Sequence, residues 1–75
     1  MTTIAQLGVG SSALVAEVEG GDEVSIRLME MGLTPGALVA VIGHAPLGDP
    51  LELEVRGYRL SIRKAEASRI KIQPL

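Results

Sequence analysis

Residues 27–36 read Arg27-Leu28-Met29-Glu30-Met31-Gly32-Leu33-Thr34-Pro35-Gly36. This stretch predicts the last turn of a helix, a glycine that ends it, and a tight turn into a strand. Gly32 follows the last expected helical residue, where a left-handed backbone is usual and glycine adopts it at the least cost. Pro35 cannot continue the helix, and Pro35-Gly36 suits the two central positions of a type II turn. The stretch holds no nucleophile, acid–base pair or phosphate loop, so it indicates a binding module rather than an enzyme.

The composition indicates one small domain, which we expect to span residues 1–75. A domain of this size buries only roughly 60% of its unfolded surface, so its core is small. The chain is 47% hydrophobic but has one Tyr and no Phe or Trp, so the core must consist of aliphatic residues. It has no Cys, which excludes disulfides, thiolate metal sites and cysteine catalysis. No apolar run is long enough to cross a bilayer and no signal peptide is recognisable, so we expect a cytoplasmic protein without direct membrane insertion.

The charge is distributed unevenly along the chain. Residues 1–50 hold one cation and six acids, a net charge of −5, whereas residues 51–75 hold six cations and three acids, a net charge of +3. We expect the two halves to pair with each other across a sheet. The alternative is a polar surface that docks a charged partner. The overall charge of −2 argues against nucleic-acid binding, which usually needs a basic surplus.

On the N-terminal side of the deciding stretch, the pattern predicts a strand followed by a helix. A turn over 4–7 should tuck two apolar side chains under the domain. In the strand 14–19, alternation places Leu14, Ala16 and Val18 on one face. Gly20-Gly21 should end the strand. Asp22 is a good N-cap for a helix over about 23–31.

On the C-terminal side, the pattern predicts three strands, a helical turn and a last strand. Residues 37–43 are apolar on both faces and indicate a buried strand, and the loop 44–50 follows. Strands over 51–55 and 58–63 alternate cleanly around a two-residue turn at Arg56-Gly57. This register pairs Glu54 with Arg59, whereas a shift by one residue would oppose Arg56 to Arg59, a like-charge pair that costs stability. Residues 64–68 fit one helical turn, and 69–73 a closing strand with Ile70 and Ile72 inward.

Five short strands with frequent turn signals predict a mainly β fold, a small and partly open barrel with one inserted helix and a short helical turn. A helix on such a barrel needs one apolar face, yet the helix over 23–31 has two. Val24, Leu28 and Met31 share one stripe, and Ile26 and Met29 lie nearly opposite. Loops could cover this second face. Otherwise it remains exposed and meets a partner, and we then expect the contact residues to be Ile26, Met29, Glu30 and Leu33.

The sequence shows no convincing metal or catalytic site. His44 is the only histidine, and it and Asp49 in the following loop are weak candidates for metal ligands. The thioethers of Met29 and Met31 suit a core or an interface better than ferrous iron. No serine has a base nearby in the sequence. We therefore expect neither enzyme activity nor a cofactor.

The order of these features resembles the FeoA family, small cytoplasmic proteins of bacterial ferrous iron transport. The resemblance covers nearly the whole chain through segments whose order and spacing together make a specific match: Arg27-Leu28-x-x-Met31-Gly32-Leu33-x-Pro35-Gly36, Pro46-x-Gly48-Asp49-Pro50, Val55-x-Gly57, Leu60-x-Ile62-Arg63-x-x-Glu66-Ala67 and Ile70-x-Ile72. It implies an SH3-like barrel and an accessory role beside FeoB, the membrane permease with a cytoplasmic GTPase domain. FeoB would then be the protein partner.

Three other interpretations stay open at this point. The same barrel resembles the C-terminal domain of iron- and manganese-dependent repressors, so the chain could be a regulatory or oligomerisation module. A small RNA-binding barrel is less consistent with the residues because stacking aromatics are missing. Self-association through Ile26 and Met29 would also bury the second apolar face of the helix.

Overall fold

The computed structural model describes residues 2–75, so Met1, the first residue of the expected domain, lies outside it. A short 3₁₀ turn precedes five strands and two helices in the following order: η1 (Ile4–Gln6), β1 (Ser12–Val18), α1 (Glu23–Glu30), β2 (Leu38–His44), β3 (Leu51–Val55), β4 (Tyr58–Ile62), α2 (Lys64–Ala67) and β5 (Ile70–Pro74). None of the helices in this part of the chain is long and apolar enough to cross a membrane.

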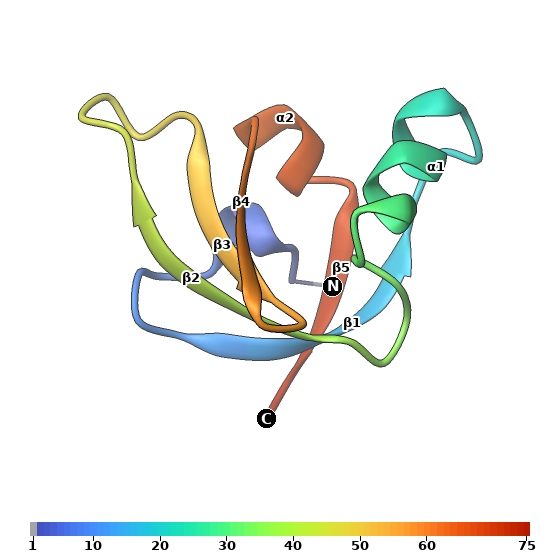
Figure 1. Ribbon diagram of the computed structural model, residues 1–75, viewed down its shortest axis with the longest axis horizontal. Helices are drawn as coiled ribbons and strands as arrows, with labels where there is room; N and C mark the ends of the chain where they lie inside the picture. Colours follow the sequence, from blue (N-terminus) through green and yellow to red (C-terminus); the bar gives the residue numbers. More distant parts are fainter. Residues whose placement is uncertain (1) are drawn as a thin grey trace.

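The strands form one curved antiparallel sheet in the order β4-β3-β2-β1-β5 (Figure 1). The strands β4 and β5 are the two ends of this order, so the barrel is not closed. Helix α1 is inserted between β1 and β2, and α2 is a single turn between β4 and β5. The prediction of a mainly β, partly open barrel with one inserted helix and a short helical turn is therefore confirmed.

The core lies on the concave side of the sheet and is aliphatic, as the composition requires. Every strand contributes to it, together with η1, both helices and the loop after α1. Its members are Ile4, Ala13, Val15, Leu28, Leu33, Ala37, Val39, Val41, Leu51, Leu53, Val55, Ile62, Ala67, Ile70 and Ile72. The predicted inward positions of Ile70 and Ile72 are confirmed.

The predicted inner face of β1 was wrong. Ala13 and Val15 are buried, whereas Leu14 and Ala16 are only half-buried. The register with β5 shifts between Val15 and Glu17, and this irregularity reverses the alternation so that Val18 again packs against the core. A single extra residue in a strand gives no signal in a pattern of apolar residues.

The prediction that the strand after the turn is buried on both faces was also wrong. Val39 and Val41 of β2 face the core, but Leu38 is 53% exposed. Strand β2 is covered on one side only, because both helices and η1 lie on the concave side of the sheet (Figure 1). An antiparallel sheet can leave its other face to solvent even where that face carries apolar residues.

The predicted hairpin register between β3 and β4 is confirmed at every pair, including Val55 with Tyr58 and Glu54 with Arg59. Arg56 and Gly57 both have positive φ, as a type I′ turn requires. Arg56 is not an ideal residue for this turn. Its side chain instead reaches the segment after α1, where Nη2 donates to Thr34 Oγ1 at 2.8 Å.

The predicted stop at Gly32 is confirmed in detail. Gly32 has φ +102°, its N–H donates to Met29 O at 3.0 Å, and the N–H of Leu33 donates to Leu28 O at 3.2 Å. This pair of bonds is the Schellman motif. Gly36 then has φ +89°, and the N–H of Ala37 donates to Thr34 O at 2.9 Å, as expected for a type II turn.

The turn at Gly36 also joins β1 to the start of β2. The N–H of Gly36 donates to Val15 O at 2.7 Å, and the N–H of Val15 donates to Ala37 O at 2.8 Å. The Schellman motif and the type II turn together therefore place β2 in register beside β1.

Three ion pairs connect the acidic half of the chain with the basic half. They are Arg27 with Glu66 at 2.6 Å, Asp22 with Arg69 at 2.7 Å, and Glu19 with Lys71 at 3.4 Å. In each pair one residue comes from 1–50 and the other from 51–75. The expectation that the two halves pair with each other is consistent with these contacts.

Substituting Gly32 by Ala should destabilise the fold more than the same change at Gly36. Both glycines have positive φ, which costs an alanine roughly 1–2 kcal/mol. A Cβ at Gly32 would also lie 2.9 Å from Tyr58 Oη, whereas a Cβ at Gly36 meets nothing within 4 Å. Displacing the tyrosine would cost its hydrogen bond as well, about 1 kcal/mol. Urea unfolding of G32A and G36A would measure the difference, and equal losses would contradict it.

Candidate functional site

Helix α1 is anchored at its N-terminus by Asp22. The Asp22 carboxylate accepts from the N–H of Ser25 at 3.1 Å, as the predicted N-cap should, and from Arg69 Nη1 at 2.7 and 2.8 Å. The buried hydroxyl of Ser25 donates to Asp22 O at 2.8 Å. The hydrogen bond from Arg69, followed by that from Ser25, lowers the pKa of Asp22 from 3.8 to about 2. The start of the helix is thus tied to the residue before β5.

The C-terminus of α1 is held by the β3–β4 hairpin. The hydroxyl of Tyr58 donates to Met31 O, and Arg56 Nε donates to Gly32 O at 3.3 Å. Midway along the helix, Arg27 pairs with Glu66 of α2. Because both ends and the middle are held by distant parts of the chain, the exposed side of α1 has a defined orientation.

The exposed side of α1 carries two apolar side chains among charged ones, which makes it the candidate site. Ile26 is 51% exposed and Met29 is 36% exposed, and Glu30 beside them is exposed as well. On the opposite side Leu28 is fully buried, and Val24 and Met31 pack against the core. No loop covers Ile26 and Met29 in the described structure. We call Ile26, Met29 and Glu30 the helix surface.

Leu33, the fourth residue expected at this surface, lies elsewhere. Its side chain is fully buried in the core, so it cannot contact a partner. The Schellman motif that ends the helix turns the chain back under α1, and a hydrophobic residue directly after the glycine commonly packs against the last turns. The pattern of helical periodicity could not show this because Leu33 is outside the helix.

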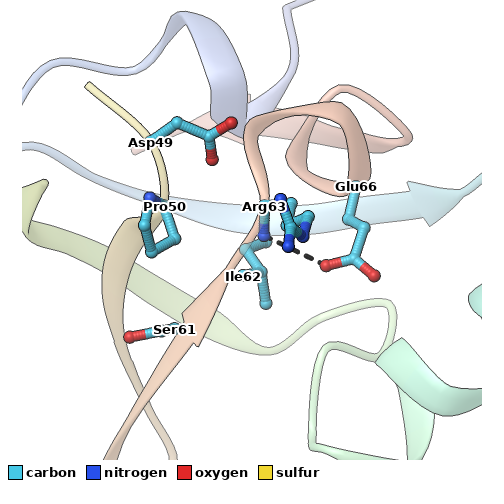
Figure 2. Close-up of a pocket in the computed structure, with 6 residues that line it drawn as sticks. All are labelled: Asp49, Pro50, Ser61, Ile62, Arg63 and Glu66. Carbon is cyan, nitrogen blue, oxygen red and sulfur yellow. Dashed lines mark hydrogen bonds between the residues drawn. The ribbon is translucent and has the colours of Figure 1, made fainter. Parts of the chain in front are cut away.

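Strand β4 and α2 border an open hollow of about 320 Å³, lined by Asp49, Pro50, Ser61, Ile62, Arg63 and Glu66 (Figure 2). Two carboxylates line it, but both already accept hydrogen bonds. Asp49 Oδ1 accepts from the N–H of Lys64 at 2.9 Å, and Glu66 Oε1 accepts from the N–H of Arg63 at 3.0 Å. These bonds hold the first turn of α2 and leave the hollow without a free acid–base pair.

His44 and Asp49, the two weak metal candidates, have separate local roles. Asp49 caps α2, and Nδ1 of His44 lies 2.8 Å from Ala45 O at the exposed end of β2. Within residues 2–75, the structure brings no three His, Cys, Asp or Glu side chains together in a way that could hold a metal ion.

The residues that hold α1 in place are not recognisable from the sequence pattern. Arg56, Tyr58, Glu66 and Arg69 each come from the second half of the chain and contact the first half. The one available signal was the opposite charge of the two halves, which predicts pairing without naming partners.

Comparison with known proteins assigns the chain to a family. The FeoA domain family matches residues 2–74. The chain belongs to the FeoA family. Its fold matches the FeoA protein from Chlorobium tepidum with a TM-score of 0.92 and 38% identity, over 99% of this chain and 70% of that one. It also matches FeoA from Stenotrophomonas maltophilia, described as an SH3 domain protein and solved with zinc, with a TM-score of 0.86 and 30% identity over 97% and 91% of the two chains.

A curated relative joins a FeoA part to a transporter. It is the Fe(2+) transport protein A/Fe(2+) transporter FeoB fusion protein of Porphyromonas gingivalis (strain ATCC BAA-308 / W83), 31% identical over 70 residues. The match covers 93% of this chain but only 8% of the fusion protein. Membership of the FeoA family links this chain to ferrous iron transport.

The same fold also occurs in a manganese-dependent transcriptional repressor. The TM-score is 0.88, over 97% of this chain and 36% of the repressor, but the identity is only 13%. This likeness shows the fold alone.

The stability that Asp22 provides should depend on pH. Since the pKa of Asp22 is lowered from 3.8 to about 2, the stabilisation is fully present above about pH 4 and is lost as the pH falls towards 2. Asp22→Asn keeps a capping oxygen but has no charge. The difference in unfolding free energy between the wild-type protein and D22N should therefore shrink across this window in urea titrations. A difference that stays constant from pH 5 to pH 2 would contradict the role of the Arg69 contact, and Arg69→Gln should remove most of the pH dependence.

Proposed function

We propose that this protein is a non-catalytic, cytoplasmic accessory protein of ferrous iron uptake that binds a FeoB-type permease through the helix surface and modulates its transport or GTPase cycle. The observation that carries the proposal is the apolar side of α1, exposed at Ile26 and Met29 on a helix that is otherwise firmly anchored. Isolated apolar residues on a surface are common, but two neighbouring ones on a rigid helix form a preorganised contact.

The identity of the partner is supported by the fusion protein of P. gingivalis, whose name places a FeoA part and FeoB in one chain. Covalent linkage raises the effective concentration of two parts that work together. A contact between the two parts also requires a surface with affinity of its own. The helix surface combines an apolar centre with the charge of Glu30, which suits a protein partner better than a nucleic acid.

The surface can be tested with Ile26→Gln combined with Met29→Gln. Glutamine is a good helix former, and neither of the two side chains belongs to the core. Calorimetric titration against the isolated GTPase domain, and against the whole permease in detergent, should show saturable binding of the wild-type protein. The double variant should bind about ten-fold more weakly or worse. Both titrations are run with and without guanine nucleotide.

Leu38→Gln is the matched control, because Leu38 is an apolar side chain that is 53% exposed on β2 and lies outside α1. It should bind as the wild-type protein does. All variants should unfold within about 0.5 kcal/mol of the wild-type protein, as surface substitutions usually do. Wild-type affinity in the double variant, or no binding to the permease in any nucleotide state, would refute the proposal.

A regulatory module of a metal-dependent repressor is the second candidate, and it is favoured only by the shared fold. A gel-shift signal with genomic DNA fragments, alone or with manganese, would support it. The net charge of −2 leads us to expect none.

A further inference from the structure

Strand β4 has a free edge. It stands at one end of the order β4-β3-β2-β1-β5, and among the described strands it pairs with β3 alone (Figure 1). At the other end of the sheet, β5 is partly covered by the N-terminal segment, since Thr3 bridges to Lys71. The edge of β4 is therefore the more open of the two, and an open edge can accept a further strand.

The hairpin register shows which backbone groups of β4 point outward. A two-residue turn closes on a hydrogen-bonded pair, here Val55 with Tyr58, and such pairs recur at every second residue in an antiparallel ladder. Leu60 and Ile62 therefore bond to β3, whereas the N–H and C=O groups of Arg59 and Ser61 point away from the sheet. The next outward N–H, that of Arg63, donates to the Glu66 carboxylate. Glu66 thus occupies the end of the edge and leaves the positions of Arg59 and Ser61 open.

The charged side chains on this strand and just after it are basic, and Arg59 lies opposite Glu54 of β3 in the hairpin. Arg59, Arg63 and Lys64 are exposed, and none of them forms an ion pair with another described residue. Arg27, Arg69 and Lys71, by contrast, each pair with a carboxylate of the other half of the chain. Arg59 and Arg63 are four positions apart, so in an extended chain they point to the same face, about 13 Å from each other.

These charges select among the strands that could be added. A second copy of β4 would bring arginines of both copies together at one edge, which is unfavourable, and such charges on edge strands commonly prevent self-pairing. An acidic strand would instead place carboxylates beside Arg59 and Arg63.

Ser61 also lines two hollows on the surface. One is the 320 Å³ hollow of Figure 2, and the other, of about 280 Å³, is lined by Glu52, Arg59, Leu60 and Ser61. Glu66 in the larger hollow is paired with Arg27, whereas Glu52 in the smaller hollow comes from β3 and lies beside Arg59.

We propose that the edge of β4 binds an extended acidic segment of another protein as an added strand, with carboxylates four positions apart beside Arg59 and Arg63. Backbone hydrogen bonds to Arg59 and Ser61 provide the affinity, and the two arginines select the charge. This edge and the helix surface share no residue, so this interaction is independent of the proposed function.

The probe is a blocked peptide of alternating Val and Thr in which two Glu residues stand four positions apart, with a matched peptide that carries Lys at the same positions. In an NMR titration, the Glu peptide should shift the amides of Arg59 and Ser61 and slow their hydrogen exchange. The Lys peptide should bind at least ten-fold more weakly. The double variant Arg59→Glu/Arg63→Glu should reverse this preference.

The backbone contact is tested by Ser61→Pro against Ser61→Val. Proline removes the outward N–H, which pairs with none of the described strands, and edge strands tolerate proline, so the fold should persist. Ser61→Pro should weaken binding of the Glu peptide about ten-fold, whereas Ser61→Val should not. If Ser61→Pro does not fold, the charge-reversal variant still decides the question.

Three results would overturn the proposal. The Glu and Lys peptides could bind equally or not at all, the amide shifts could map to α1, or sedimentation could show that β4 pairs with a second copy of the chain. The variant Ile26→Gln/Met29→Gln should bind the Glu peptide normally, so failure at the edge is distinguishable from failure of the helix surface.

Discussion

After helix α1 the chain has to turn back within a few residues so that β2 can lie beside β1. The left-handed backbone of Gly32 makes this turn possible. The space at Gly32 is filled by Tyr58, whose hydroxyl binds Met31 O, and by Arg56, which binds Gly32 O and Thr34. A larger residue at position 32 would displace these contacts. The end of the helix, the register of β1 with β2, and the docking of the hairpin therefore depend on one glycine.

The anchoring of α1 explains how a small domain can present an apolar surface without burying it. Asp22 and Arg69 hold one end of the helix, the hairpin holds the other, and Arg27 with Glu66 holds the middle. Exposed ion pairs contribute little stability individually. Here they fix the rotation of the helix about its own axis, so that Leu28 faces the core and Ile26 and Met29 face outward. The core beneath the helix is already filled by Leu28 and Leu33.

The fold of this protein does not define its function. A manganese-dependent repressor shares it at 13% identity, and FeoA proteins share it at 30% and more. What distinguishes one use from another is the surface that is placed on the barrel. In this chain two surfaces stand out, the helix surface of α1 and the edge of β4. The edge of β4 exists because the sheet is not closed (Figure 1).

The sequence by itself determined the features that depend on local backbone geometry: the N-cap at Asp22, the stop at Gly32 and the turn at Pro35-Gly36. It also determined the register of β3 with β4, because a shift by one residue would place Arg56 opposite Arg59, two like charges. It also showed that α1 has a second apolar face. Only the tertiary structure decided that Leu33 is core, that the irregularity after Val15 reverses the faces of β1, and that Arg56, Tyr58 and Arg69 hold the helix. The contacts of Arg56, Tyr58 and Arg69 with the helix, and the pairing of β1 with β5, join residues more than twenty positions apart, and a local pattern carries no information about which distant residue fills a given space. Leu33 lies one residue after the glycine stop, where helical periodicity no longer applies.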